Sequence, residues 1–387
     1  MNGTIYMPVG EACSSISDTY REKKNMVTLI NTSDVLEGRV LNHERVPNSN
    51  LKGQFKKTFQ RDDILYSEIR PQNRRFAYVD FSPIDYIAST KLMVIRAKKD
   101  VVSPKYLYYF LKNSSTVAEL QLLAETRSGT FPQITFSEVA NLTIPVPSLA
   151  VQEVIVQTMQ CLEDKITCNE QINDNLQQQA FSVFDNLIAN AENNDCTVSD
   201  YAFLNPKRTL TKNQVARSID MSQLSTSGAF PSGWEMKPFN GGMRFTNGDT
   251  LLARITPCLE NGKTAFIDFL DDGEVAFGST EYIVLAPKNG TPPEMLYCLA
   301  RYPAFVDYAV KNMNGSSGRQ RVSAETVGQY RLPLFDKHSL VLFKEVVSPM
   351  FLKMRYNSLE NIRLSELRDA LLPKLMSGEI DVSAVQL

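Results

Sequence analysis

The residues of this 387-residue sequence whose types and spacing could do chemistry are cations, amides and hydroxyls, several of them beside glycines. Such side chains contact phosphates and base edges: arginine and lysine suit guanine, whereas asparagine and glutamine suit adenine. A neighbouring glycine lets the backbone approach a phosphate. The candidate DNA contacts are Lys52, Lys56, Arg70, Gln72, Arg74, Arg75, Arg127, Ser128, Thr130, Gln133, Arg254, Lys263, Asn314, Arg319, Gln320 and Arg321. Taken singly, each could instead be a solvent-facing residue of an ordinary turn.

The overall charge and the local charge point in different directions. The formal net charge of -2 argues against a nucleic-acid partner, because such domains usually carry a basic excess. Residues 52–75, however, carry seven basic and three acidic side chains, and acid-free basic runs follow at 207–217 and 311–321. Cations that recur in both halves favour phosphate contacts, which need charge only where a duplex is touched. Solvated faces are the alternative interpretation.

The sequence lacks the motifs that would make it an enzyme. An adenine methyltransferase needs Asn or Asp followed by Pro-Pro and an aromatic residue, but Asn205-Pro206 is followed by two cations. Residues 257–264 resemble a phosphate-binding loop without its first glycine, and the next five residues have a strand pattern instead of a helical one. His43 and His338 lie in unrelated contexts. We therefore expect no catalytic residue, no metal site and no cofactor.

Composition places the chain in a reducing compartment. Its six cysteines show neither the spacing of a zinc site nor the density of a secreted disulfide scaffold. No apolar run approaches the roughly 20 residues that cross a bilayer, and residues 1–19 have no basic segment followed by an apolar one. We expect a cytoplasmic protein with no membrane partner.

The sequence repeats itself at offsets of 186 to 190 residues. The first copy has anchor segments at 63–71, 89–95, 128–129 and 144–145, and the second has them at 249–257, 279–285, 317–318 and 332–333. Such ordered recurrence indicates an internal duplication. Each copy begins with short β-branched and aromatic runs, such as 76–81 and 92–95. A proline then opens an expected helix at 104–111 in the first copy and at 293–299 in the second.

Each copy ends in a heptad pattern that predicts a long helical arm. The apolar positions are Ile155, Met159, Leu162, Ile166, Leu176, Ala180, Val183 and Leu187 in the first arm and Phe343, Val347, Met350, Met354, Leu364, Leu367 and Leu371 in the second. Pro349 should kink the second arm or delay its regular part.

Two asparagine pairs occupy the middle of these seams, and the pairs lie 188 residues apart. A buried seam asparagine needs a polar partner and so penalises wrong registers. We predict antiparallel arms that place Asn169 near Asn361 and Asn173 near Asn357. The alternative is two surface helices whose asparagines face water.

Several of these segments resemble one known family. Residues 364–379 resemble the closing helix of specificity subunits of type I restriction-modification systems, and residues 144–153, 169–173 and 279–285 are also similar to that family. The likeness extends over nearly the whole chain. It departs at Lys91, where the family more often has an acidic residue such as Glu281, so the electrostatics of that strand are open in the first copy.

The resemblance implies an α+β fold with two similar target recognition domains, each followed by a long helix, and the helices forming an antiparallel coiled coil. The expected boundaries are 1–147 and 193–335 for the recognition domains, 148–192 for the first spacer helix, and 336–387 for the second spacer helix and tail. It implies a non-catalytic subunit that reads a split sequence in double-stranded DNA. Its partners would be two methyltransferase subunits and nuclease/translocase subunits. The alternative is an adaptor whose two domains bind protein, with the helices as a spacer.

Overall fold

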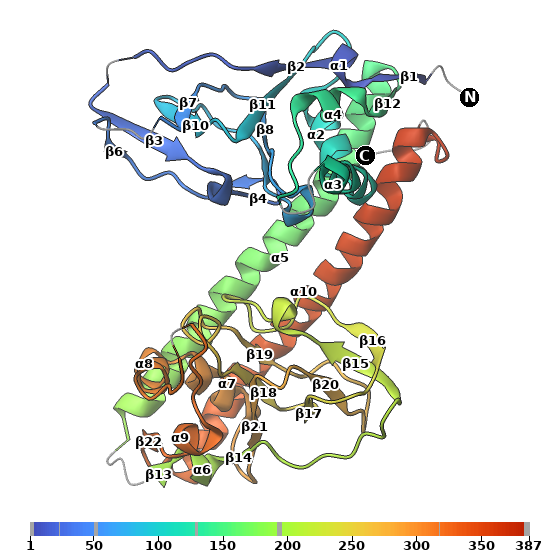
Figure 1. The fold of residues 1–387 in the computed structure, drawn as a ribbon. Coiled ribbons are helices and arrows are strands. Elements are labelled where there is room, and N and C mark those ends of the chain that lie inside the picture. Colours follow the sequence, from blue (N-terminus) through green and yellow to red (C-terminus); the bar gives the residue numbers. More distant parts are fainter. Residues whose placement is uncertain are drawn as a thin grey trace. The chain divides into compact units, whose positions relative to one another are not determined.

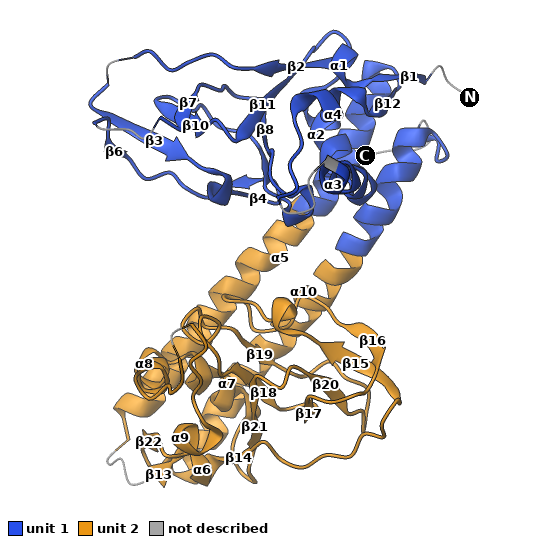
Figure 2. Cartoon of the chain, viewed as in Figure 1, with its two compact units in different colours: residues 1–163, 365–387 blue, residues 164–364 orange. Residues whose placement is uncertain are grey.

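The structure, a computed structural model, describes residues 4–22, 24–49, 53–127, 131–191, 196–316 and 318–382, with only the backbone of Arg127. The chain forms two compact units (Figure 2). The first unit comprises residues 1–163 and 365–387, and the second comprises residues 164–364. Both long helices therefore contribute residues to both units.

Two four-stranded sheets form the strand-rich part of the first unit (Figure 1). One is antiparallel, in the order β2 (Cys13–Ile16), β11 (Leu92–Ala97), β8 (Ile64–Ser67), β9 (Phe76–Tyr78). The other has the order β6 (Val46–Pro47), β3 (Met26–Ile30), β10 (Tyr86–Ser89), β7 (Phe55–Lys57), and β10 runs parallel to β3. Two short pairs complete the strands: β1 (Ile5–Pro8) with β12 (Thr143–Val146), and β4 (Val35–Leu36) with β5 (Arg39–Val40).

The short helices of the first unit are α1 (Val9–Ala12), α2 (Pro104–Lys112), α3 (Ser114–Arg127), α4 (Phe136–Asn141) and the 3₁₀ turns η1 (Thr32–Asp34) and η2 (Pro71–Asn73). Helix α2 begins at a proline, which lacks the N–H that a first helical turn leaves unbonded. Six of its nine residues are buried, among them Tyr106 and Tyr109. The helix expected at 104–111 is thus present, and its aromatic face belongs to the core of this unit.

The second unit repeats this architecture. Its antiparallel sheet has the order β14 (Ala202–Leu204), β21 (Tyr282–Pro287), β18 (Thr250–Ala253), β19 (Thr264–Phe266). Its other sheet has the order β16 (Glu235–Pro238), β15 (Val215–Ile219), β20 (Ala276–Gly278), β17 (Met243–Phe245), and β15 runs parallel to β20. The remaining elements are β13 (Cys196–Thr197), β22 (Arg331–Leu332), α6 (Val198–Tyr201), α7 (Pro293–Arg301), α8 (Pro303–Lys311), α9 (Ala324–Gly328) and η3 (Met221–Gln223). The matching strand orders, including the one parallel pair, show that the duplicated sequence folds twice into the same topology.

The long helices α5 (Leu149–Ala189) and α10 (Lys337–Ser377) have 41 residues each. In the second unit they run side by side in opposite directions, because residues 169 and 173 of α5 contact residues 361 and 357 of α10 (Figure 2). Apolar seam residues such as Ala180, Val347 and Met354 are at most 1% exposed. The α+β fold with two similar domains and an antiparallel coiled coil is therefore confirmed.

Two details of the second arm differ from the sequence prediction. Helix α10 runs from Lys337 onward, so of the two effects expected of Pro349, a kink or a delayed start, the delayed start does not occur. Leu367, assigned to the seam, is 46% exposed. In its place Arg368 reaches Glu163, at 3.9 Å, and Leu372 is buried. Leu371, also assigned to the seam, is partly buried against the same core, so the apolar seam at this end continues through Leu371 and Leu372 without Leu367.

Candidate nucleic-acid interface

The predicted DNA contacts fall into three groups. Lys52, Ser128 and Thr130 lie outside the described residues, as does the side chain of Arg127. The exposed candidates are Lys56, Arg70, Gln72, Asn314 and Arg319. The half-exposed ones are Arg74, Arg75, Gln133, Arg254, Lys263, Gln320 and Arg321.

Three exposed cations are available to a ligand. Lys56 lies on β7, and Arg70 precedes η2 with a left-handed backbone, φ 45°. Arg319 lies in the loop between α8 and α9. Within the described ranges, none of these side chains has a hydrogen bond or ion pair. Each can therefore meet a phosphate without first breaking an intramolecular contact.

Other predicted cations hold the protein's own loops. Arg75 donates to the carbonyls of Ser33, at 3.0 Å, and Val35, at 3.4 Å. Arg74 donates to Ser114 Oγ at 2.8 Å, and Lys263 donates to the Met221 carbonyl at 2.8 Å. These bonds give the three side chains a structural role.

The basic run at 207–217 is also largely engaged within the chain. Arg208 makes two 2.7 Å bonds to the carboxylate of Asp249, which is 1% exposed. Burial raises the pKa of Asp249, and the guanidinium opposes that rise. Arg217 bonds Glu274 at 2.7 Å. These two arginines thus stabilise the second unit, and only Lys207 and Lys212 of the run are exposed.

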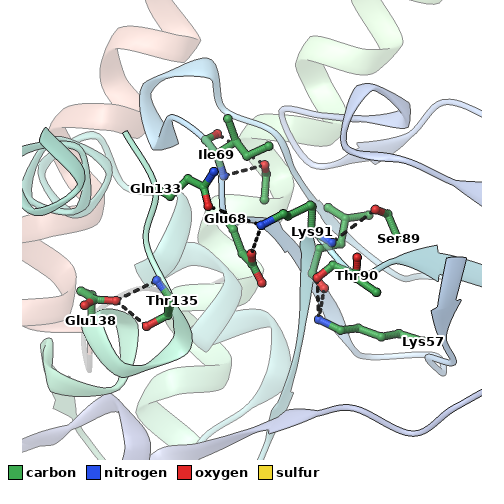
Figure 3. A network of polar contacts seen from close by, with 11 residues as sticks. Lys57, Glu68, Ile69, Ser89, Thr90, Lys91, Gln133, Thr135 and Glu138 are labelled. Carbon is green, nitrogen blue, oxygen red and sulfur yellow. Dashed lines mark hydrogen bonds and ion pairs between the residues drawn. The ribbon is translucent and has the colours of Figure 1, made fainter. Parts of the chain in front are cut away.

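In each unit, three polar side chains meet where the strands of the antiparallel sheet end. The first cluster is Glu68, after β8, with Lys91, between β10 and β11, and Gln133, before α4 (Figure 3). Lys91 Nζ lies 3.5 Å from Glu68 Oε2 and 3.4 Å from Gln133 Oε1. Nearby, Lys57 Nζ donates to the carbonyls of Thr90 and Leu92, at 3.1 and 2.8 Å, and so fixes the turn that carries Lys91.

The second cluster is Arg254, after β18, with Glu281, between β20 and β21, and Arg321, before α9. Arg321 bonds the Glu281 carboxylate through Nε, at 2.9 and 3.0 Å, and through Nη2, at 2.7 Å. The two arginines hold the pKa of Glu281 below its usual range, with the Arg321 hydrogen bond as the largest cause. The Nε atom of Arg254 is buried and has no partner in the described structure.

The same backbone frame carries both clusters. The Glu68 amide donates to the Lys91 carbonyl at 3.0 Å, as the Arg254 amide does to the Glu281 carbonyl. The backbone of Gln133 forms an isolated antiparallel β-bridge with Ile69, and the backbone of Arg321 forms the same kind of bridge with Ile255. The first and second clusters therefore occupy equivalent positions of the repeat.

The structure also brings the seam asparagines together in the second unit. Asn169, fully buried, donates to Asn361 Oδ1 at 2.8 Å and to Glu360 Oε2 at 2.7 Å. Asn357 donates to Asn173 Oδ1 at 2.8 Å. Their function as register markers remains our proposal.

A double-mutant cycle tests that proposal. Asn169→Leu alone should lower the free energy of unfolding by about 1–3 kcal/mol, because Asn361 loses its buried partner. Adding Asn361→Leu should recover most of that loss, since both polar groups are then gone. Urea unfolding measures both changes, and Cys168→Ala, an exposed neighbour on α5, is the control. Additive losses would show that the asparagines do not act as a pair.

No group of three histidine, cysteine or acidic side chains that could hold a metal is present in the ranges described. Nor does any described helix have the length and apolar character to cross a membrane. A duplicated α+β domain with polar clusters at its strand ends, and a long helix after each copy, is an architecture that suits a protein with two recognition surfaces.

Comparison with known proteins indicates that the molecule recognised is DNA. Residues 13–178 match the family described as type I restriction modification DNA specificity domain. The HindI specificity subunit of Haemophilus influenzae is 29% identical, over 92% of this chain and 94% of that protein. The MjaIX specificity subunit of Methanocaldococcus jannaschii is 22% identical, over 78% and 76%. The crystal structure of the type I system S subunit from M. genitalium has the same fold, with a TM-score of 0.52 at 16% identity and coverage of 97% and 96%.

Residues 13–178 thus form a type I DNA specificity domain, and the chain matches a type I specificity subunit along nearly the whole length of both proteins. It is a non-catalytic DNA-recognition subunit, as the resemblance in the sequence implied. The protein-binding adaptor is not favoured.

Sequence reasoning named Gln133, Arg254 and Arg321 but missed their cluster partners. Glu68 and Glu281 are not predicted from the sequence because a search for cations and amides selects no acids. A signal was present, since Lys91 and Glu281 occupy the same place in a repeated Ser-Thr anchor with opposite charges.

Proposed function

We propose that this subunit reads a split target in double-stranded DNA, one half-site with each strand-rich domain, and brings methyltransferase and nuclease/translocase subunits to it. The observation that carries the proposal is the presence of two equivalent polar clusters in one chain. Dimeric readers match palindromes by presenting the same surface twice. A single chain with two non-identical copies suits two different half-sites.

Two equivalent grooves support a pair of methyltransferase subunits. In the second unit a groove of about 550 Å³ lies between the end of α5 and the start of α10, lined by Val183, Leu187 and Leu342 among others. In the first unit a groove of about 710 Å³ lies between the start of α5 and the end of α10, lined by residues that include Val151 and Leu375. Equivalent apolar surfaces suit two copies of one partner.

Methylation mapping tests the proposal. The chain is co-expressed with its methyltransferase subunit, and methylated adenines are mapped across the host genome with and without the chain. We expect a split motif that appears only with the chain, and native mass spectrometry of the complex should show two methyltransferase subunits. A folded chain that forms the complex without producing any motif would refute the reading function.

The salt dependence of binding separates DNA recognition from a protein-binding adaptor. Phosphate contacts make the logarithm of the affinity fall linearly with the logarithm of salt concentration, whereas an apolar protein interface responds weakly. A steep slope with a duplex supports the reading function. When the slope is measured for single variants, it also shows whether a given cation contacts a phosphate.

Arg319→Ala should weaken binding to all duplexes by a similar factor and reduce the magnitude of the salt slope by about one. The cause is the loss of one exposed cation that has no intramolecular partner among the residues described. Fluorescence anisotropy at several salt concentrations measures both quantities. Lys337→Ala removes an exposed charge from the start of α10 and serves as the control. If the two variants behave alike, Arg319 makes no phosphate contact.

A further inference from the structure

The two clusters share a backbone frame but have inverted polarity. Where the first has an acid, a cation and an amide, the second has a cation, an acid and a cation. The equivalent pairs are Glu68 with Arg254, Lys91 with Glu281, and Gln133 with Arg321. A duplicated frame with charge inverted at two positions, and an amide replaced by a cation at the third, presents different hydrogen-bonding groups at the same place in each domain.

In the second cluster, the bonds that Arg321 makes leave two of its N–H donors free. A guanidinium has five N–H donors. Nε and one N–H of Nη2 bond the Glu281 carboxylate, and one N–H of Nη1 donates to the Arg319 carbonyl at 3.1 Å. One N–H remains on each terminal nitrogen, and O6 and N7 of guanine are two acceptors that an arginine bonds in the major groove. Glu281 holds the guanidinium plane and so lowers the entropy lost on binding.

In the first cluster, Lys91 fixes the orientation of an amide instead. Its ammonium has donors only, so the Gln133 atom that faces it at 3.4 Å is Oε1. The Nε2 group then points away from Lys91, and Oε1 keeps a second lone pair. A donor beside an acceptor on one amide matches N7 and N6 of adenine.

The exposed cations lie close to both clusters in the sequence. Arg70 follows Glu68 by two residues, and Arg319 precedes Arg321 by two. In protein–DNA interfaces, phosphate contacts fix the register and neighbouring polar side chains reach the base edges. Both clusters have this arrangement of a half-exposed reader beside an unpaired cation.

We propose that Arg321 reads a guanine and Gln133 an adenine at equivalent positions of the two half-sites. Glu281 and Lys91 are positioning residues that orient these readers. The inference rests on the proposed function and adds the residue that determines base identity in each domain.

Exchanging the clusters tests this assignment. The triple variant Arg254→Glu, Glu281→Lys and Arg321→Gln gives the second domain the side chains of the first, and Glu68→Arg, Lys91→Glu and Gln133→Arg does the reverse. Each full-length chain is co-expressed with the methyltransferase subunit, and methylated motifs are mapped. We expect guanine to become adenine at one position of one half-site in the first variant, and adenine to become guanine in the second. The other half-site should stay unchanged.

Single variants examine the reader and its positioning residue separately. Arg321→Lys keeps the charge but loses the planar pair of donors, so preference for guanine should fall on the order of ten- to a hundredfold. Glu281→Ala should relax preference at the same position without a change in melting temperature, which a structural role alone would not produce. Both are measured with purified complexes and a randomised duplex pool, which needs no methylation. Lys337→Ala, which removes an exposed cation at the start of α10, is the control.

Failure of the assignment of Arg321 and Gln133 can be told apart from failure of the proposed DNA-reading function. Absence of any motif with the wild-type chain refutes the reading function itself. A wild-type motif that neither exchange alters, or that changes in the half-site of the other domain, refutes only the assignment of these readers. If an exchanged chain does not methylate, the base preference of Arg321→Lys in the duplex pool decides.

Discussion

Arg208→Ala should lower the free energy of unfolding of the second unit by about 3–5 kcal/mol. The reason is that Asp249, 1% exposed, would lose the cation that bonds both of its oxygens, and because burial already raises its pKa to about 7, the acid would have to take up a proton and stay buried without those bonds. Among the described residues, the other bond to this carboxylate is from the Thr246 amide, at 2.8 Å, and one amide cannot replace a bidentate guanidinium. Urea unfolding followed by circular dichroism measures the loss.

The adjacent residue is a matched control for this experiment. Lys207 belongs to the same basic run but is exposed, so Lys207→Ala should change stability by less than about 0.5 kcal/mol. The two variants also separate the structural role from DNA contact. If Arg208→Ala left stability intact and weakened only duplex binding, the buried ion pair would not be the reason for this arginine.

The first unit contains the corresponding acid with a different partner. Asp63, fully buried, is bonded by Arg96 at 2.7 and 2.8 Å. Asp63 and Asp249 begin the same repeated anchor, but Arg96 comes from β11 whereas Arg208 comes from the loop after β14. The requirement for a cation is therefore repeated, while the strand or loop that provides it is not.

The helices of this fold can be predicted from the sequence, whereas the pairing of its strands cannot. The helices α2 and α7 were predicted because proline at the first position and an aromatic face are local signals. The long helices were predicted because a heptad pattern is periodic. Which strands pair, and in which order, depends on contacts between residues far apart, and no local pattern records them. The parallel pair within each mixed sheet was not predicted for that reason.

The candidate site shows the same limit at the level of single residues. Loop position and charge selected Arg70 and Arg319, which are exposed. The same criteria selected Arg75, whose guanidinium instead bonds backbone carbonyls 40 and 42 residues away in the chain. A cation's type predicts what it can bind, but only the fold determines whether an internal acceptor already occupies it.

The contact between α10 and the second recognition domain provides the other large expected effect. Phe351 is 1% exposed, and its ring lies 5.2 Å from that of Phe266 on β19 and 5.5 Å from that of Tyr297 on α7. Phe351→Ala should cost about 3–5 kcal/mol, because it removes a buried aromatic side chain and leaves a cavity that rigid neighbours fill poorly. Leu352→Ala changes the next residue, which is 42% exposed, and should cost far less.

Because Phe351 joins the long helix to the domain carrying the second cluster, we expect its loss to affect one half-site first. In methylation mapping at increasing temperature, the Phe351→Ala variant should lose sequence preference in the half-site assigned to the second domain while preference in the other persists. The two units have separate cores, so local loosening of one need not unfold the other. Simultaneous loss of both preferences at one temperature would mean that the units unfold as a single cooperative structure.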